Sequence, residues 1–360
     1  YGGVGYAGYP AGAAGTIYQK ATAAQLGAVY INNEARPATS ATTPLEGNLP
    51  ETIYLNNTKL DLADGSTITE IQAANNSLVN ALGTLLPGAD PLILSNITLS
   101  IAQPLNWTSA LKLDGAALTI SGENRFSDLT LTNGAVLTHP AGFASGLQLV
   151  VSGTVSVDAG SRLDVSGRGK GSDGTGSGKY RTGASYGGQG GPVPGYTGKA
   201  AYGNPRAPAA LGSGNYTTDP GSAIRGGGAL KLVANVLELD GQVLANGASS
   251  SRNDYGGGSG GSIWLEVGSL SGTGAIAADG GAGRNYNGTN DSSAGGGGGR
   301  IAIYYGGVNG FDLATQTHAY GGVGYAGYPA GAAGTIYQKA TAAQLGAVYI
   351  NNEARPATSA

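Results

Sequence analysis

The residue types best suited to acid–base chemistry are scarce in this chain, which has only two histidines, His139 and His318. They lie far apart in the sequence, and neither has a neighbouring acidic cluster to complete a metal site or a serine–histidine–aspartate triad. The chain also contains no cysteine, which excludes disulfides, thiolate metal ligands and a cysteine nucleophile. We therefore expect neither histidine to be catalytic.

The densest group of charges lies between residues 158 and 173, where carboxylates alternate with basic side chains. Such carboxylates can act as paired acids that cleave polysaccharides, or as ligands of calcium. Asp158, however, belongs to a turn pattern of Asp or Asn followed by Gly, in which the side chain hydrogen-bonds to nearby backbone. We therefore predict no catalytic residue, no metal site and no cofactor, and weak calcium binding is the alternative. The charged group consists of Asp158, Arg162, Asp164, Arg168, Lys170 and Asp173.

Several asparagines stand in the pattern N-x-[ST], which is the acceptor sequence for N-glycosylation of surface loops in secreted proteins. A chain so rich in Asn, Ser and Thr contains some of these patterns by chance. We treat all of them as candidate glycosylation sites: Asn56, Asn75, Asn96, Asn106, Asn215, Asn287 and Asn290.

The strongest feature of the sequence is a duplicated segment, because Tyr1–Ala41 returns letter for letter as Tyr320–Ala360. Residues 1–319 therefore form one full repeat unit, and residues 320–360 begin the next unit of a tandem array. Aromatic residues gather at this boundary, and such residues are typical of interfaces. We predict a unit-junction interface formed by Tyr1, Tyr6, Tyr9, Tyr18, Tyr30, Tyr320, Tyr325, Tyr328, Tyr337 and Tyr349.

Composition restricts the classes of partner. Glycine accounts for 67 of 360 residues, charged residues for only 11%, and the formal net charge is −3. This balance gives no electrostatic reason to expect nucleic acid as a partner, and no apolar run approaches the length of a membrane span. The absence of methionine is expected of an excerpt from a longer chain, and the abundance of Gly, Ser, Thr, Asn and Tyr favours an extracellular or cell-surface location.

Leu92–Gly167 has the most regular pattern in the chain. Short segments such as Leu111–Leu113 and Leu129–Leu131 alternate apolar and polar residues, and similar segments recur about every eight to eleven residues. Turn signals such as Asp114-Gly115 and Asn133-Gly134 lie between them. The pattern predicts an all-β fold and favours a parallel β-helix, or β-solenoid. An array of β-sandwiches is the alternative.

One stretch indicates a helix, over about Glu70–Leu86, because its apolar residues fall on one helical stripe and Pro87-Gly88 follows as a stop signal. We expect this short helix to cover an edge or an end of the core. The stripe consists of Ile71, Leu78, Leu82 and Leu85.

A second stretch, Arg168–Gly228, has almost no strand pattern and is rich in glycine and tyrosine. A segment of this length without regular structure is unusual inside a compact domain. We interpret it as an insertion into the β-solenoid, either an ordered lateral lobe or a flexible loop. The spaced tyrosines favour order, and the glycines are expected to let backbones approach closely.

Three stretches carry a resemblance to a known group of proteins. Gly226–Gly247 (GGGALKLVANVLELDGQVLANG), Gly257–Gly281 and Gly295–Tyr305 (GGGGGRIAIYY) resemble the glycine-rich β-helical repeats of very large microbial surface and adhesin-like proteins. The resemblance covers roughly Leu111–Tyr305 and implies a right-handed β-solenoid outside the cell. It implies no catalytic residue.

These observations favour a structural function: a repeat of an extracellular filament, sheath or adhesin stalk that self-assembles end to end. Its partners are then neighbouring repeats and laterally adjacent fibres, and about eight to twelve rungs per unit predict an axial advance of roughly 40–60 Å. Two alternatives remain. A carbohydrate-binding adhesin module would contact glycans through exposed tyrosines and Trp107 or Trp264, and a β-helical polysaccharide-degrading enzyme would use Asp158 and Asp164.

Overall fold

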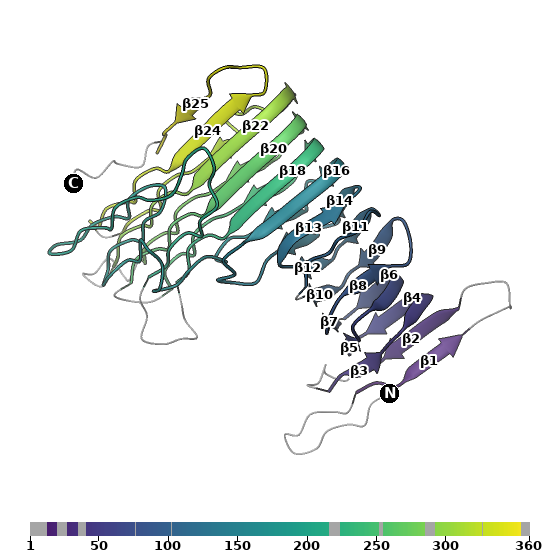
Figure 1. The fold of residues 1–360 in the computed structure, drawn as a ribbon. Coiled ribbons are helices and arrows are strands. Elements are labelled where there is room, and N and C mark those ends of the chain that lie inside the picture. Colours follow the sequence, from purple (N-terminus) through teal and green to yellow (C-terminus); the bar gives the residue numbers. More distant parts are fainter. Residues whose placement is uncertain are drawn as a thin grey trace, which may run out of the picture. The chain divides into compact units, whose positions relative to one another are not determined.

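The computed structural model describes residues 13–19, 27–34, 41–75, 77–101, 103–215, 224–251, 255–284, 292–325 and 327–353. This part of the chain is all-β and contains no helix, and most of its strands lie parallel in sheets (Figure 1). The chain divides into two compact units. Unit 1 comprises Tyr1–Thr138 and Val150–Arg162, and unit 2 comprises His139–Leu149 and Leu163–Ala360.

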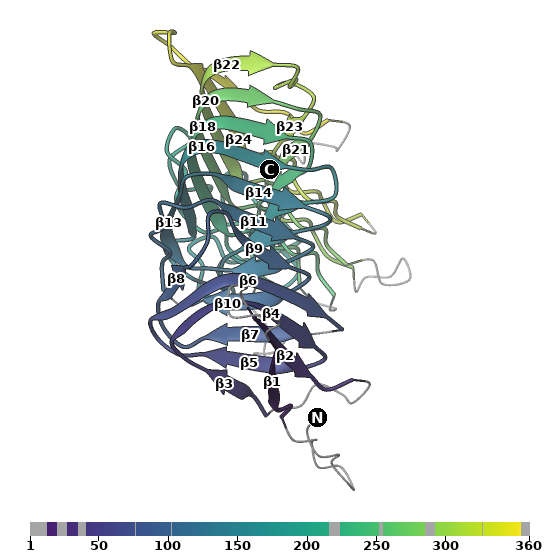
Figure 2. The same ribbon diagram turned by 90° about the vertical axis from the view of Figure 1, so that its right-hand side faces the viewer.

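In unit 1 the chain alternates between two sheets, so that each turn of the chain contributes a strand to one sheet and then to the other (Figure 2). The strand order is β1-β2-β4-β6-β9-β11-β14-β16 in the first sheet and β3-β5-β7-β10-β12-β15 in the second. The first-sheet strands are β1 (Thr16–Gln19), β2 (Ala28–Asn32), β4 (Asn48–Asn56), β6 (Ser66–Ala74), β9 (Leu92–Ser95), β11 (Leu111–Asp114), β14 (Leu129–Thr132) and β16 (Leu147–Val157). The second-sheet strands are β3 (Thr43–Leu45), β5 (Lys59–Leu62), β7 (Leu78–Ala81), β10 (Thr98–Ile101), β12 (Ala117–Thr119) and β15 (Val136–Thr138). The short strands β8 (Leu85–Pro87) and β13 (Gly122–Phe126) pair at the side of the first sheet, and β17 (Arg162–Asp164) begins in unit 1 and continues into unit 2.

The core of unit 1 consists of aliphatic columns formed by successive turns. In β11, Leu111 and Leu113 are buried, and Lys112 between them is half-exposed. This is the alternation predicted from the sequence. Leu111 pairs with Leu92 on one side and with Leu129 on the other, so leucine stacks on leucine. Each fully buried leucine contributes about 1.5–3 kcal/mol to stability, and the repeated register adds this contribution at every turn.

Several connections between the strands contain residues that tolerate positive φ. Gly65, Gly115 and Gly134 have φ of 75°, 63° and 81°, as the Asp-Gly and Asn-Gly signals predict. Between neighbouring strands, side-chain amides and carboxylates also bond to one another. Asn80 of β7 donates to its paired residue Asp61 of β5, 19 residues earlier in the chain, at 2.9 Å.

The helix predicted over Glu70–Leu86 is wrong, because this stretch forms the end of β6, then β7 and β8. Ile71 and Leu85 are buried as the stripe requires, but Leu82 is exposed. Parallel partners on both sides of β6 and β7 outweigh the local helical periodicity. Asn75, with φ of 50°, ends β6 and turns the chain toward β7.

Unit 2 contains longer strands and longer turns. Its strands follow the order β18-β20-β22-β24-β25 in one sheet and β23-β21-β19 in the other. Between β18 and β20 paired positions lie 33 residues apart, and the same spacing joins the Thr273 amide to the Asp240 carboxylate at 3.0 Å. The bounds are β18 (Ala229–Leu239), β19 (Gln242–Leu244), β20 (Ser262–Ser271), β21 (Ala275–Ala277), β22 (Arg300–Asn309), β23 (Thr317–His318), β24 (Thr335–Ala340) and β25 (Ala347–Tyr349).

The extra residues of each turn in unit 2 form a glycine layer, which comprises the described residues of 168–228, 246–261, 278–299 and 319–334. These segments contain no regular strand among the described residues, yet most of their glycines are buried. Their backbone amides donate to neighbouring segments in a pattern that repeats every three residues. Gly296 and Gly299 donate to segment 278–281, whereas Gly297 donates to Ala184 and Gly298 to Ala332.

This threefold repeat matches the geometry of polyproline II, which has three residues per turn and no internal hydrogen bonds. Each segment therefore satisfies its amides through several neighbouring segments. Such packing requires glycine, because the segments touch backbone to backbone. A Cβ atom on Gly297 would lie 2.0 Å from the carbonyl oxygen of Gly188, and one on Gly296 would lie 2.0 Å from that of Gly258.

The described part of the stretch Arg168–Gly228, which the sequence predicts as an insertion, belongs to the glycine layer. Tyr186 is fully buried in it, and its hydroxyl lies 2.6 Å from Ser262 Oγ. The Tyr202 hydroxyl donates to the Leu211 carbonyl at 2.9 Å. Tyr186 therefore contacts β20, and Tyr202 contacts another residue of its own segment.

Replacing Gly297 by alanine should destabilise unit 2 by about 1–3 kcal/mol or more, because the added Cβ overlaps the Gly188 carbonyl oxygen. The matched control is Gly307→Ala, since nothing lies within 4 Å of its Cβ position and its backbone is not left-handed. Urea denaturation followed by circular dichroism measures both variants. Equal midpoints for the two variants would contradict the close-packed glycine layer.

Candidate junction interface

Both copies of the duplicated segment fold into the same antiparallel hairpin, which we call the junction hairpin. In the first copy it consists of β1 and β2, with Ile17 opposite Tyr30. In the second copy it consists of β24 and β25, with Ile336 opposite Tyr349. These pairs occupy the same places in the two copies, so the hairpin register is identical. Figure 1 shows β1 beside β2 and β24 beside β25.

The hairpins also share an internal packing contact. A Cβ on Gly27 would lie 2.4 Å from the ring of Tyr18, and a Cβ on Gly346 would lie 2.4 Å from the ring of Tyr337. In each copy the tyrosine of the first strand therefore lies directly on the glycine that precedes the second strand. The segment keeps one internal structure in two different surroundings.

In the first copy the second strand of the hairpin joins the sheet of unit 1. β2 pairs in parallel with β4, and the rings of Tyr30 and Tyr54 stack at 4.9 Å with an interplanar angle of 10°. The Asn56 side-chain amide donates to Asn32 Oδ1 at 2.9 Å. Directly after β2, the backbone amide of Asn33 donates to the backbone carbonyl of Asn56 at 3.0 Å.

In the second copy the first strand of the hairpin joins the sheet of unit 2. β24 pairs in parallel with β22, with Ile336 opposite Ile301. Arg300 donates to Thr335 Oγ1 at 2.9 Å. Gly334 enters the glycine layer, where a Cβ would lie 1.8 Å from the Gly299 carbonyl oxygen, whereas its counterpart Gly15 has nothing within 4 Å.

Burial is consequently reversed between the two copies. Ile17 in the first strand is 59% exposed, but its counterpart Ile336 is 7% exposed. In the second strand Ile31 is fully buried, but its counterpart Ile350 is 69% exposed. The exposed fractions of the two valines differ in the same way, at 6% for Val29 and 50% for its counterpart Val348. Each copy therefore presents to solvent the apolar side chains that the other copy buries.

The predicted junction tyrosines divide into three groups. Tyr1, Tyr6 and Tyr9 lie outside the described residues. Tyr18, Tyr30, Tyr337 and Tyr349 lie on the junction hairpins. Tyr320, Tyr325 and Tyr328 belong to the glycine layer of unit 2, where Tyr320 stacks on His318 and Tyr328 accepts a hydrogen bond from Arg181. The aliphatic side chains Ile17 and Ile350 were not predicted as junction residues, although their place in an alternating pattern beside the tyrosines was a usable signal.

The carboxylates among residues 158–173 accept hydrogen bonds from nearby backbone amides or form a local ion pair. Asp158 accepts hydrogen bonds from the Asn133 amide at 2.7 Å and the Gly160 amide at 3.1 Å. Burial alone would raise the pKa of Asp158, but bonds from Ser161, Asn133 and Gly160 hold it below its ordinary value. Asp164 accepts from the Ser166 amide, and Asp173 pairs with Lys170 at 3.2 Å. These contacts favour the turn role for Asp158.

The candidate glycosylation sites differ in accessibility. Asn75, Asn96 and Asn106 are exposed, and Asn56 is half-buried with its amide bonded to Asn32. Asn215 is fully buried and donates to the Thr182 carbonyl at 2.7 Å, so it is inaccessible to a glycan in the folded chain. The remaining two, Asn287 and Asn290, lie outside the described residues.

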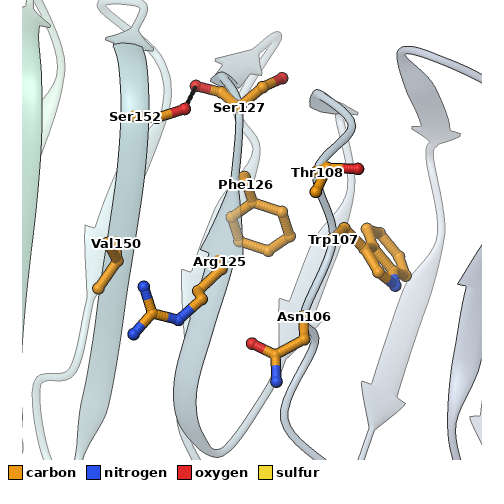
Figure 3. Close-up of a pocket in the computed structure, with 8 residues that line it drawn as sticks. All are labelled: Asn106, Trp107, Thr108, Arg125, Phe126, Ser127, Val150 and Ser152. Carbon is orange, nitrogen blue, oxygen red and sulfur yellow. Dashed lines mark hydrogen bonds between the residues drawn. The ribbon is translucent and has the colours of Figure 1, made fainter.

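A hollow of 390 Å³ on unit 1 lies over Trp107 and Phe126 (Figure 3). Both rings are buried and meet edge to face at 5.9 Å, and the Trp107 indole donates to the Leu85 carbonyl at 3.0 Å. The expectation that Trp107 is an exposed aromatic for glycans is therefore wrong. Trp264 is half-buried, and the ammonium of Lys231 lies 3.9 Å from its ring centroid.

In the described ranges no three His, Asp or Glu side chains come together where they could hold a metal ion. The same ranges hold no helix that could span a membrane. Comparison of the chain with protein-family models, with curated proteins and with solved structures gave no match.

The two histidines have different surroundings. His318 Nδ1 lies 2.9 Å from Asp279 Oδ1. His139 is fully buried, its Nδ1 donates to the Pro140 carbonyl at 2.8 Å, and its Nε2 has no hydrogen-bond partner among the described residues. Burial, with a smaller contribution from the charge of Arg168, lowers the pKa of His139 to about 4, although the hydrogen bond to the Pro140 carbonyl acts to raise it.

Unit 2 should therefore lose stability as the pH falls from about 6.5 to about 4, because the unfolded chain binds a proton at His139 before the folded chain does. The loss reaches roughly 3 kcal/mol when both states are protonated. Urea unfolding at a series of pH values measures it, and His139→Gln should flatten this part of the curve. Parallel curves for the two proteins would contradict a buried neutral histidine.

Proposed function

We propose that this chain is a structural repeat of an extracellular filament, sheath or adhesin stalk, wound as a parallel β-helix with a glycine-rich lateral layer. In this proposal the chain performs no catalysis and its main partners are further copies of the same unit. The observation that supports the proposal is that the two terminal hairpins, β1–β2 in unit 1 and β24–β25 in unit 2, are formed by one and the same sequence.

The alternation between two sheets supports the β-helix. Leu60, Val79, Leu99 and Leu118 follow one another in parallel register through β5, β7, β10 and β12, with strands of the first sheet between each pair along the chain. A coil with one strand per sheet in every turn produces this order. Such a coil grows by adding turns, so its natural partner at either end is another turn of the same kind.

The terminal strands support self-association. β1 and β25 are the last strands of their sheets, and a terminal strand offers backbone hydrogen-bonding groups to a further strand. Exposed Ile17 and Ile350 add apolar surface at the same places. Low charge allows copies to approach without strong repulsion, and the Gly-, Ser-, Thr- and Asn-rich composition supports an extracellular location.

Electron microscopy of the chain extended by one and by two further units, each with the sequence of residues 42–360, tests this function. The particle should lengthen by a constant increment of roughly 40–60 Å per unit, because rungs stack about 4.8 Å apart. The 360-residue chain on the same grid is the control. Units separated by variable distances, or a compact particle of growing width, would overturn the structural reading.

A further inference from the structure

We infer that the duplicated segment forms a single hairpin shared by two successive repeat units. The first strand of the hairpin pairs with the last sheet strand of the preceding repeat unit, and its second strand pairs with the first sheet strand of the following one. The inference rests on the proposed function, since it applies to units joined in series. In the first copy β2 pairs with β4 of unit 1, and in the second copy β24 pairs with β22 of unit 2. These are opposite edges of the same hairpin, so one hairpin can make both pairings at once.

The upstream pairing follows from the second copy. If the β22–β24 register is transferred to the first copy, Thr16 lies opposite Arg300 of the preceding unit and Ile17 lies opposite Ile301. Thr16 then accepts the hydrogen bond that Thr335 accepts here, and Gly15 takes the place of Gly334 in the glycine layer. The exposed side chain of Ile17 becomes buried, as that of its counterpart is.

The downstream pairing follows from the first copy. If the β2–β4 register is transferred to the second copy, Tyr349 lies opposite Tyr54 of the following unit and can stack on its ring as Tyr30 does. Ile350 lies opposite Leu55 and takes up the buried position of Ile31. Asn351 then accepts from Asn56 of the following unit, because its counterpart does so in the first copy.

The competing arrangement places two complete hairpins edge to edge, with β25 of one copy against β1 of another. This pairing occurs nowhere in the described residues. The shared hairpin, in contrast, uses two registers that the same sequence already adopts, and it leaves the hairpin's internal register and its Tyr–Gly contact unchanged. Edge-to-edge stacking is therefore the outcome that would overturn the inference.

A disulfide in a two-unit chain, residues 1–360 followed by residues 42–360, tests the register. The chain has no native cysteine, so a cysteine at Tyr349 and one at Tyr54 of the added unit form a unique pair. Residues directly opposite on parallel strands lie about 4.8 Å apart, within the range that a disulfide spans. We expect nearly complete oxidation, as for the positive control Tyr30→Cys with Tyr54→Cys in the 360-residue chain.

The matched negative control pairs Tyr349→Cys with Asn56→Cys of the added unit. This pair is two residues out of register and about 8 Å apart, which is too far for a disulfide without backbone movement. Oxidation of the out-of-register pair, or failure of the in-register pair while its positive control oxidises, would overturn the shared hairpin.

A charge substitution provides an independent measurement. Ile350→Lys should leave the unfolding midpoint of the 360-residue chain unchanged, because the side chain is exposed. In the two-unit chain the same substitution should lower the midpoint as much as Ile31→Lys does in the 360-residue chain. An unchanged midpoint in the two-unit chain would overturn the inference.

The two proposals fail separately. If the in-register disulfide does not form but particles lengthen by a constant increment, the units join through another surface and the shared hairpin is wrong. If the disulfide forms but the increments are irregular, the shared hairpin stands and the filament function is wrong.

Discussion

A β-strand has two hydrogen-bonding edges, and both must find partners when the strand is buried. In each unit successive turns satisfy this requirement by placing one strand beside the next, in parallel and in register. The aliphatic columns, the polar corners and the positive-φ glycines all follow from that register. The requirement is left open where a sheet ends. In the sheet that contains the longer strands, the terminal strands β1 and β25 both belong to the duplicated segment.

The glycine layer of unit 2 meets the same requirement without a sheet. Threefold segments send successive amides to different neighbours, as Gly296, Gly297 and Gly298 do. Three-directional bonding joins segments that are far apart in the sequence, and it works only if no side chain separates them. The layer explains why so large a share of the chain is glycine and why it is nevertheless ordered.

Much of the strand pattern could be predicted from local signals. Leu111 and Leu113 alternate with polar residues, and Gly115 follows an aspartate. This pattern predicts both the strand and the turn after it. The helix over Glu70–Leu86 was wrong because helical spacing of Ile71 and Leu85 arose from two different strands, each with its own partners. Local periodicity contains no information about such partners.

The sequence also indicated that glycines bring backbones together, but not which segments meet, because a glycine has no side chain whose pattern could identify its neighbour. At the junction the duplication was visible at once, and the tyrosines of the hairpin were predicted there. The reversal of burial could not be predicted, since two identical sequences contain identical local signals. It depends on which strand of the hairpin each unit engages, which is a property of the neighbouring sheet.

Hydrogen exchange of the duplicated segment tests the central claim most directly. In the first copy the Asn33 amide donates to the Asn56 carbonyl of the next turn, and this amide should be protected. We predict that the amide of its counterpart Asn352 exchanges readily in the 360-residue chain and about a hundredfold more slowly when a further repeat unit follows. Equal exchange rates for the Asn352 amide in the two chains would show that the second copy does not begin the next sheet, and would contradict the shared hairpin.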